Sequence, residues 1–152
     1  MNSSKVHHIL AHSYAFYFIA FLAGLFLDAL FPIKIFASAG SAPLGFALLI
    51  LASLLIFWAQ KTSHRLGKDT QKEAMTKETF CRGPYCYTRS PTHWGLLLLM
   101  LGFGMISNSF FIVIFTLVAF LITRFVFVKK MEKHLVDKYG APYVEYKKIV
   151  RF

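Results

Sequence analysis

The polar turn at residues 89–93 carries side chains that can do chemistry, and a long apolar stretch follows it directly. It holds a cation, Arg89, and an imidazole, His93, which titrates near neutral pH and can accept a proton. Pro91 fixes its own φ angle and disfavours helix at Ser90, so we expect a rigid turn where the apolar stretch begins. The alternative for His93 is a histidine that only caps the start of a helix.

A second candidate is Arg124, the one basic residue inside a long apolar stretch. A cation in lipid is costly unless it is paired, so such a residue is a candidate for binding or catalysis. The alternative is that its long side chain reaches the headgroups at the membrane surface.

The composition is that of an integral membrane protein. Apolar residues make up 57% of the 152 positions and charged residues 16%, more apolar surface than a soluble chain of this length can bury. The excess of Lys and Arg does not indicate nucleic-acid binding, because these residues lie in loops between apolar runs. Length and pattern predict one domain over residues 1–152.

The apolar runs predict an all-α fold with about four transmembrane helices. The last run, residues 94–128, would be about 52 Å long as one helix, too long for one crossing, so we expect a helical hairpin with a turn at residues 107–109. The predicted spans cover residues 14–31, 44–59, 94–106 and 110–128.

The basic residues predict the orientation. Residues 61–89 and 129–151 each hold seven Lys and Arg, whereas the connection at residues 33–43 holds only Lys34. Cationic loops stay in the cytoplasm, so four spans would place both termini and the central loop there. The bilayer itself is thus an expected partner.

The segment after the last span predicts a further helix. Met131, Leu135 and Tyr139 recur every four positions, and Gly140 suits the position after a helix end. We expect this helix to continue from the span along the cytoplasmic membrane surface, its basic side toward anionic lipid.

The cysteine and histidine patterns predict no metal site. Cys81 and Cys86 do not have the spacing of a metal knuckle, and in a cytoplasmic loop we expect two free thiols. His8 and His12 lie one helical turn apart but lack a third ligand nearby, so we expect them to be solvated.

Two groups of residues in the C-terminal half carry a family resemblance. The first group is Gly83, Tyr85, Arg89, Pro91 and Gly95, and the second is Glu132, Leu135, Gly140, Tyr143 and Tyr146. With this order and spacing, residues 83–150 resemble the isoprenylcysteine carboxyl methyltransferase family and its relatives, the phospholipid methyltransferases. Those are small integral membrane enzymes that use S-adenosylmethionine.

The resemblance implies where the cofactor binds and which residues act. The implied cofactor-binding positions are Lys77, Glu78, Thr79, Phe80, Tyr85, Ser90, Pro91, Thr92, His93 and Glu132. The candidate catalytic residues are Arg89, His93 and Arg124. The implied function is methyl transfer from S-adenosylmethionine to a membrane-embedded lipid or lipidated acceptor. A carboxylate acceptor needs no strong base, whereas an amine must lose a proton, which His93 could accept.

The chain departs from the family pattern at four positions, which keeps alternatives open. Ser90 stands where the family usually has His or Asn, and His93 stands where it has Tyr. Met131 stands where the family has a first glutamate that contacts the cofactor, and Phe127 stands where the isoprenylcysteine enzymes have an arginine facing the substrate. Arg124, one turn earlier, could replace that arginine. The alternative is a non-catalytic membrane module of the same fold. A sterol-reductase-like NADPH enzyme is disfavoured, because Leu96 follows Gly95 where those proteins have Glu.

Overall fold

The computed structural model describes residues 3–36, 39–69 and 76–150, which are helical over most of their length. The helices are α1 (Ser3–Leu30), η1 (Ala39–Ser41), α2 (Ala42–Asp69), α3 (Lys77–Phe80), η2 (Gly83–Cys86), α4 (Pro91–Ile106), α5 (Phe110–Ile122), η3 (Thr123–Val128), α6 (Lys129–Tyr139) and α7 (Ala141–Ile149). Of the short elements, η1 and η2 are 3₁₀ helices and η3 is a π-helical segment. The predicted all-α fold is confirmed.

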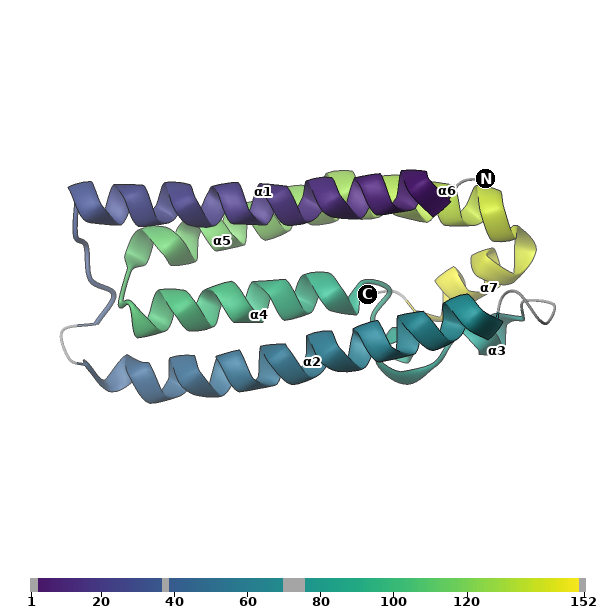
Figure 1. Cartoon of the computed structure of the whole chain (residues 1–152), viewed down its shortest axis with the longest axis horizontal. Coiled ribbons are helices and arrows are strands. Elements are labelled where there is room, and N and C mark those ends of the chain that lie inside the picture. The colour runs from purple at the N-terminus through teal and green to yellow at the C-terminus, as the bar shows by residue number, and fades with distance from the viewer. Residues whose placement is uncertain (1–2, 37–38, 70–75, 151–152) are drawn as a thin grey trace.

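Four helices form an elongated bundle (Figure 1). α1 packs on α5, α2 packs on α4, and α4 packs on α5, so the last two helices join the two pairs. The predicted hairpin is present, with its turn at residues 107–109 between α4 and α5. Asn108 makes this turn with a positive φ of 52°, a conformation that asparagine tolerates better than most residues.

Three helical stretches are long and apolar enough to cross a membrane: Ala11–Leu30, Ala42–Leu66 and Phe110–Tyr139. α4 is apolar but has only 16 residues, so at about 1.5 Å per residue it is about 24 Å long, short of a hydrocarbon core of about 30 Å. The first, second and fourth predicted spans therefore match long helices. The third exists as a bundle helix, and its crossing stays a prediction.

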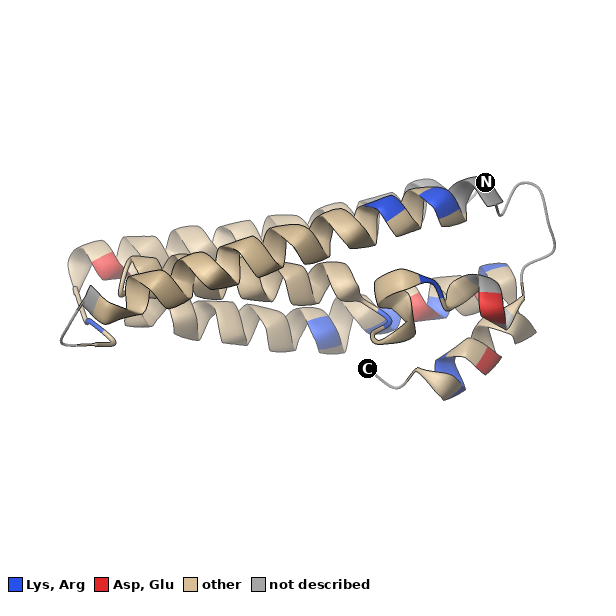
Figure 2. Ribbon diagram, turned by 90° about the horizontal axis from the view of Figure 1, so that it is seen from below, with Lys and Arg blue, Asp and Glu red and all other residues tan. Residues whose placement is uncertain are grey.

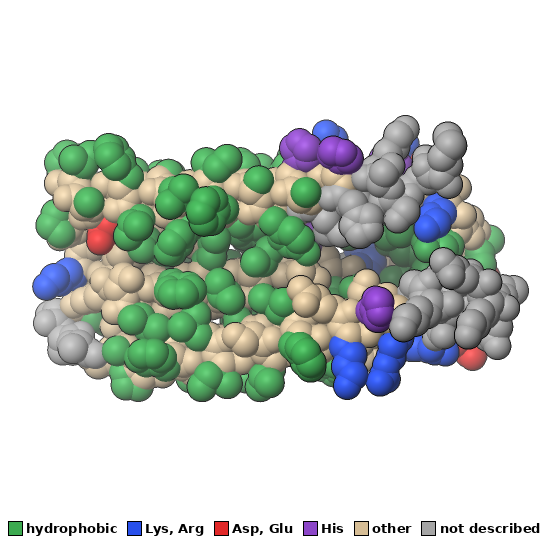
Figure 3. All heavy atoms as spheres, viewed as in Figure 1, with side chains coloured by type: hydrophobic (Ala, Val, Ile, Leu, Met, Phe, Trp, Pro, Cys, Tyr) green, Lys and Arg blue, Asp and Glu red, His purple; other side chains and the backbone are tan. Residues whose placement is uncertain are grey.

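The surface of the bundle suits lipid. Side chains such as Phe26 and Phe57 are about two-thirds exposed, and Figure 3 shows hydrophobic side chains spread along the bundle. Exposed apolar surface of this extent is not sustained in water. Lys and Arg gather toward the end of the bundle that holds α3, α6 and α7 (Figures 2 and 3). The start of α1 and the connection between α2 and α4 lie toward this same end (Figure 1).

Close helix packing holds α4 against α2. A Cβ atom on Gly45 would lie 2.8 Å from the carbonyl oxygen of Gly102, and one on Gly102 would lie 2.9 Å from the carbonyl oxygen of Gly45. A Cβ atom on Gly95 would clash with the Ile56 side chain. Small residues let the two backbones approach, as is common between membrane helices, and so fix where α4 begins.

The helix after the last span differs from expectation in its direction. α5, η3 and α6 form one continuous helical stretch, and α6 carries on along the direction of α5 in Figure 1. The expected continuation is confirmed, but α6 does not turn aside to lie across the end of the bundle. The π-helical segment Thr123–Val128 connects α5 to α6 without a break in the helix.

Cys81 and Cys86 form a disulfide, so the prediction of two free thiols is wrong. The 3₁₀ helix η2 turns the chain between them and brings their Cα atoms to 4.5 Å, within the range of bridged cysteines. The prediction considered only compartment and metal-ligand spacing, and neither reveals that turn.

Candidate functional site

The loop before α4 is fixed against α2. Gly83 opens η2 with a positive φ of 58°, and a Cβ atom there would lie 2.8 Å from the Thr62 hydroxyl and 3.2 Å from the Trp58 ring nitrogen. Glycine is therefore required both by the backbone and by the close approach. Ser90 is the N-cap residue and Pro91 the first residue of α4, the position where proline's missing N–H costs nothing. α4 thus begins at Pro91, where the long apolar stretch of the sequence begins, and the rigidity of this turn stays a prediction.

An ion-pair network joins this turn to α6 and α7. Arg89 Nη1 lies 2.7 Å from Glu132 Oε1, and Lys147 Nζ lies 2.9 Å from Glu132 Oε2. The Glu132 side chain is 9% exposed and the Arg89 side chain 16%, whereas that of Lys147 is 43% exposed. Both carboxylate oxygens of Glu132 are therefore engaged. Glu132 thus holds Arg89 and, through Lys147, α7 in place.

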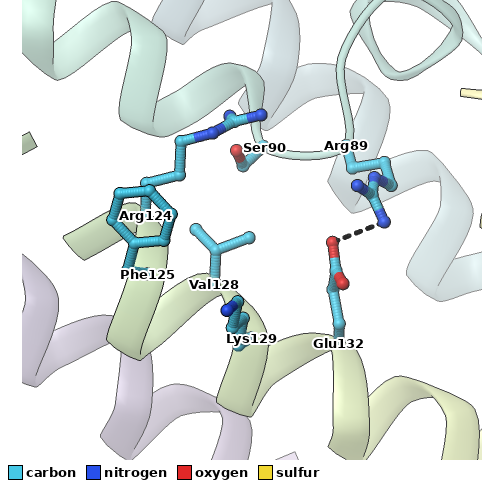
Figure 4. Close-up of a pocket in the computed structure, with 7 residues that line it drawn as sticks. All are labelled: Arg89, Ser90, Arg124, Phe125, Val128, Lys129 and Glu132. Atoms are coloured by element: carbon cyan, nitrogen blue, oxygen red, sulfur yellow. Dashed lines mark ion pairs between the residues drawn. The ribbon is translucent and has the colours of Figure 1, made fainter. Parts of the chain in front are cut away.

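A cavity of about 160 Å³ opens beside this network (Figure 4). The residues that line it are Arg89, Ser90, Arg124, Phe125, Val128, Lys129 and Glu132. Three are cations, and the one carboxylate among them is already shared by two cations. The cavity therefore favours an anionic group.

The π-helical segment brings Arg124 to this cavity. Figure 4 shows the Arg124 side chain reaching toward Ser90 across the space from Glu132. Within the described chain Arg124 forms no salt bridge. Phe127, in contrast, packs its ring 6.2 Å from that of Phe16 on α1. The segment thus turns Arg124 toward the cavity and Phe127 toward α1, and π-helical turns often occur at functional sites.

An aromatic cluster closes α7 over the loop. Phe80, Tyr143, Tyr146 and Val150 are buried together, and the Tyr146 hydroxyl donates a hydrogen bond of 2.5 Å to the Tyr85 carbonyl. Burial raises the pKa of Tyr85 and raises that of Tyr143 to about 12, so both phenols stay protonated near neutral pH. They can donate hydrogen bonds but cannot act as anions there.

The predicted site residues separate into three places. Arg89, Ser90, Arg124 and Glu132 line the cavity together. His93 is 4% exposed and faces Tyr17 of α1, with 6.4 Å between the ring centroids, and it does not line the cavity.

The remaining predicted residues lie around the loop. Pro91 is buried at the start of α4, and the Thr92 side chain interacts with the hydroxyls of Tyr14 and Tyr85. Phe80 belongs to the aromatic cluster and Glu78 is exposed. Lys77 and Thr79 belong to α3, and their side chains lie outside the described part. The structure thus brings part of the predicted set together beside the turn at residues 89–93, but the whole set does not form one compact group.

Sequence reasoning missed several residues of the site. Val128 and Lys129 line the cavity, and Lys147 completes the ion-pair network. No sequence signal marks a π-helical segment, so the facing of residues 123–128 could not be derived. Tyr17 was missed because α1 reads as a plain apolar span.

Comparison with known families identifies residues 41–141 as a phospholipid methyltransferase segment. The match runs from the start of α2 to the start of α7 and contains the whole cavity, whereas α1 lies outside it. Neither the comparison with curated proteins nor that with solved structures gives a match. The match spans more than half of the chain, and the protein therefore belongs to the phospholipid methyltransferase family.

Proposed function

We propose that this membrane methyltransferase transfers the methyl group of S-adenosylmethionine to a membrane-embedded lipid or lipidated acceptor at the cavity beside the turn at residues 89–93. The observation that carries the proposal is the position of Arg124. It is a cation at the end of an apolar helix, without an ion pair to the described residues, and it faces a cavity that Arg89 and Glu132 complete. Family membership supports the reaction class.

The size of the cavity bears on what it holds. Pockets for whole drug-sized ligands measure about 300–1,000 Å³, so about 160 Å³ accommodates only part of such a molecule. An acceptor headgroup is of suitable size, with its apolar tail left in the bilayer beside the exposed side chain of Phe125. The acceptor would then enter sideways from the lipid.

The residues present fit the cofactor by type. Its carboxylate suits Arg89 of the turn, and its adenine ring suits the aromatic cluster of Phe80 and Tyr143. The bound cofactor supplies a methyl group whose bond to sulfur breaks with the electron pair remaining on sulfur. The proposed cofactor-binding set remains Lys77, Glu78, Thr79, Phe80, Tyr85, Ser90, Pro91, Thr92, His93 and Glu132.

The roles proposed for the chain's own residues follow from their surroundings. Arg124 binds the anionic part of the acceptor, and Arg89, held by Glu132, shapes the opposite wall. His93 accepts a proton from an acceptor that carries one on its reacting atom. The apolar helices around the site exclude water, which favours alignment and transfer over side reactions.

Binding of the cofactor by the purified protein tests the proposal. Radiolabelled methyl groups are expected to pass from S-adenosylmethionine to an organic-soluble product of a membrane extract. Label found only in water-soluble small molecules contradicts the lipid acceptor. No binding at millimolar cofactor supports instead the non-catalytic module, the alternative favoured by Met131 in place of the family's first glutamate.

We propose a multi-pass orientation with both termini cytoplasmic. It is supported by the gathering of Lys and Arg at one end of the bundle, since cationic loops remain in the cytoplasm. After Cys81 and Cys86 are replaced by serine, a single cysteine at Ser107 should react with an impermeant reagent from outside, and one at Glu145 should not. The reverse labelling pattern overturns this orientation.

A further inference from the structure

Behind the wall of the cavity, Tyr17 of α1 lies against two other buried polar side chains, His93 of α4 and Thr123 of η3. Tyr17, His93 and Thr123 are exposed by only 1%, 4% and 0%. The Tyr17 ring lies against that of His93, and its hydroxyl lies against the Thr123 side chain. Each group adjoins the cavity: Thr123 directly precedes Arg124, and Ser90 lies one turn before His93.

Each of these side chains has a buried polar atom that is not satisfied by a hydrogen bond within the described residues. Tyr17 Oη, His93 Nε2 and Thr123 Oγ1 are buried, and none completes a hydrogen bond of ordinary geometry within the described residues. Thr116, two turns before Thr123, behaves differently, because its hydroxyl donates to the Ile112 carbonyl at 2.7 Å. Buried polar atoms in native proteins are nearly always partnered, so three neighbouring exceptions point to one shared partner.

The surroundings leave few other partners for them. Tyr17 packs in a buried cluster with Met100 and Ala119, which offer no side-chain hydrogen-bonding group of ordinary strength. The backbone N–H and C=O groups of α1, α4 and α5 near Tyr17 form hydrogen bonds within their own helices. A partner for the three polar atoms must therefore be small and polar.

We propose that Tyr17, His93 and Thr123 together bind one buried water molecule, which connects His93 Nε2 with the acceptor site as a path for a proton. A buried water typically makes about three hydrogen bonds to otherwise unsatisfied groups, which is the number offered here. The two hydroxyls can each donate or accept, and an unprotonated ring nitrogen accepts. The water thus satisfies all three side chains.

The chemical consequence rests on the proposed function. When the reacting atom of the acceptor is an ammonium nitrogen, it has no free lone pair, so one proton must leave before that nitrogen can form its bond to the methyl carbon. The lone pair of His93 Nε2 forms the new N–H bond, with the water passing the proton on. Tyr17 and Thr123 are positioning residues, since they act through the water and His93. α1, outside the family match, thereby contributes to the site.

A double-mutant cycle tests the shared water without any assay of activity. Tyr17→Phe and Thr123→Val each remove one hydroxyl with little change of shape, and Thr116→Val is the matched control. Each of the first two variants should lower the unfolding temperature of detergent-purified protein by about 2–4 °C. The double variant should lose little more than either single variant, because the first change already releases the water.

Additive losses, or a rise in unfolding temperature in either single variant, overturn the proposal. The control pair, Tyr17→Phe with Thr116→Val, should be additive, because the Thr116 bond lies within its own helix. This comparison separates a shared partner from general loosening of the bundle.

Nitrogen NMR of the histidine ring provides a second measurement. With ¹⁵N-labelled histidine, assigned through His93→Gln, the Nε2 signal should move in Tyr17→Phe and Thr123→Val and stay in place in Thr116→Val. An unmoved signal in both test variants overturns the proposal.

Methyl transfer adds the catalytic readout. With radiolabelled S-adenosylmethionine and vesicles of an amine-bearing phospholipid, Thr123→Val should lower the turnover rate and leave the cofactor dissociation constant unchanged. An unchanged rate overturns the proton path. Absence of transfer in the unmutated protein instead counts against the proposed function, while the thermal cycle and the NMR signal still decide on the buried site.

Discussion

The two ends of the bundle are held together by different kinds of interaction. At the far end, residues 33–36 meet the turn at residues 107–109 and the start of α5. There the Asn108 side chain accepts hydrogen bonds from the backbone N–H groups of Ile35 and Phe36 at 3.1 and 2.9 Å and donates one to the Phe36 carbonyl at 2.8 Å. At the site end, around the cavity, Glu132 joins Arg89 and Lys147 through its charge.

The comparison distinguishes polar side chains that complete the fold from charged side chains that are available for binding. Asn108 satisfies backbone groups and leaves no charge behind, so the far end closes the bundle at low electrostatic cost. The site end keeps buried charges, and Arg124 there has no acidic partner in the described chain. Charge without full neutralisation is costly near lipid, so it supports the proposal that the ligand binds at this end.

Breaking the ion-pair network should have the largest effect on stability. Glu132→Ala removes the carboxylate that pairs with the largely buried Arg89 and should lower the free energy of unfolding by about 3 kcal/mol. Lys147→Gln is the control, with an expected loss of about 1 kcal/mol or less, because the Lys147 side chain is 43% exposed.

Denaturant unfolding in detergent measures both losses. Combining Arg89→Met with Glu132→Met should recover much of the stability that Glu132→Ala loses, since no buried charge is then left alone. A double variant no more stable than Glu132→Ala would show that the network is not what holds the site end.

Removing the charge of Arg124 should impair methyl transfer more than folding. Arg124→Gln should lower methyl transfer by about ten- to hundredfold, the worth of a charge-assisted hydrogen bond of about 1.5–3 kcal/mol. Its stability and its cofactor affinity should change little, because no partner within the described chain is lost. Lys130→Gln, an exposed cation outside the cavity lining, is the control. Equal losses in both variants would remove the special role of Arg124.

The far end should show the opposite behaviour. Asn108→Ala loses three hydrogen bonds to the backbone and places a less tolerant residue at positive φ, so it should cost about 1–2 kcal/mol of stability. Asn108→Gly separates the two causes, because it loses the bonds but accepts the backbone angle. Both variants should bind S-adenosylmethionine with unchanged affinity, and weakened binding would contradict the division between the two ends.

A single hydrogen bond gives the smallest expected effect. Tyr146→Phe removes the bond to the Tyr85 carbonyl and keeps the ring within the aromatic cluster, so it should cost about 1 kcal/mol. Proteolysis within α7 should become faster, as the bond is one of the links that hold this helix to the loop. An unchanged cleavage rate would mean that ring packing and the Lys147 ion pair suffice.

The fold could be predicted from the sequence where hydropathy and turn chemistry act locally. The long helices, the hairpin turn at Asn108 and the helix after Val128 follow from apolar runs and from residue preferences. The direction of α6 could not be predicted, because it depends on a π-helical segment that no residue preference marks.

The candidate site was predictable only where sequence spacing translates into contact. Arg89 and Glu132 were singled out separately and prove to form one ion pair. The pairing of Cys81 with Cys86, the facing of Arg124 and the role of Tyr17 depend on how distant segments pack or how a short turn folds. Such tertiary relations have no local signature in the sequence.

The hydrogen bonds of the Asn108 side chain have a consequence for the order in which the protein assembles. Its partners, Ile35 and Phe36, leave the ribosome some seventy residues before it does. In the proposed orientation the first two helices are therefore inserted, with their connecting loop already outside, before the second hairpin delivers Asn108 across the bilayer. Once Asn108 has crossed the bilayer, its hydrogen bonds join the two hairpins. These bonds can therefore form only after both hairpins have been inserted.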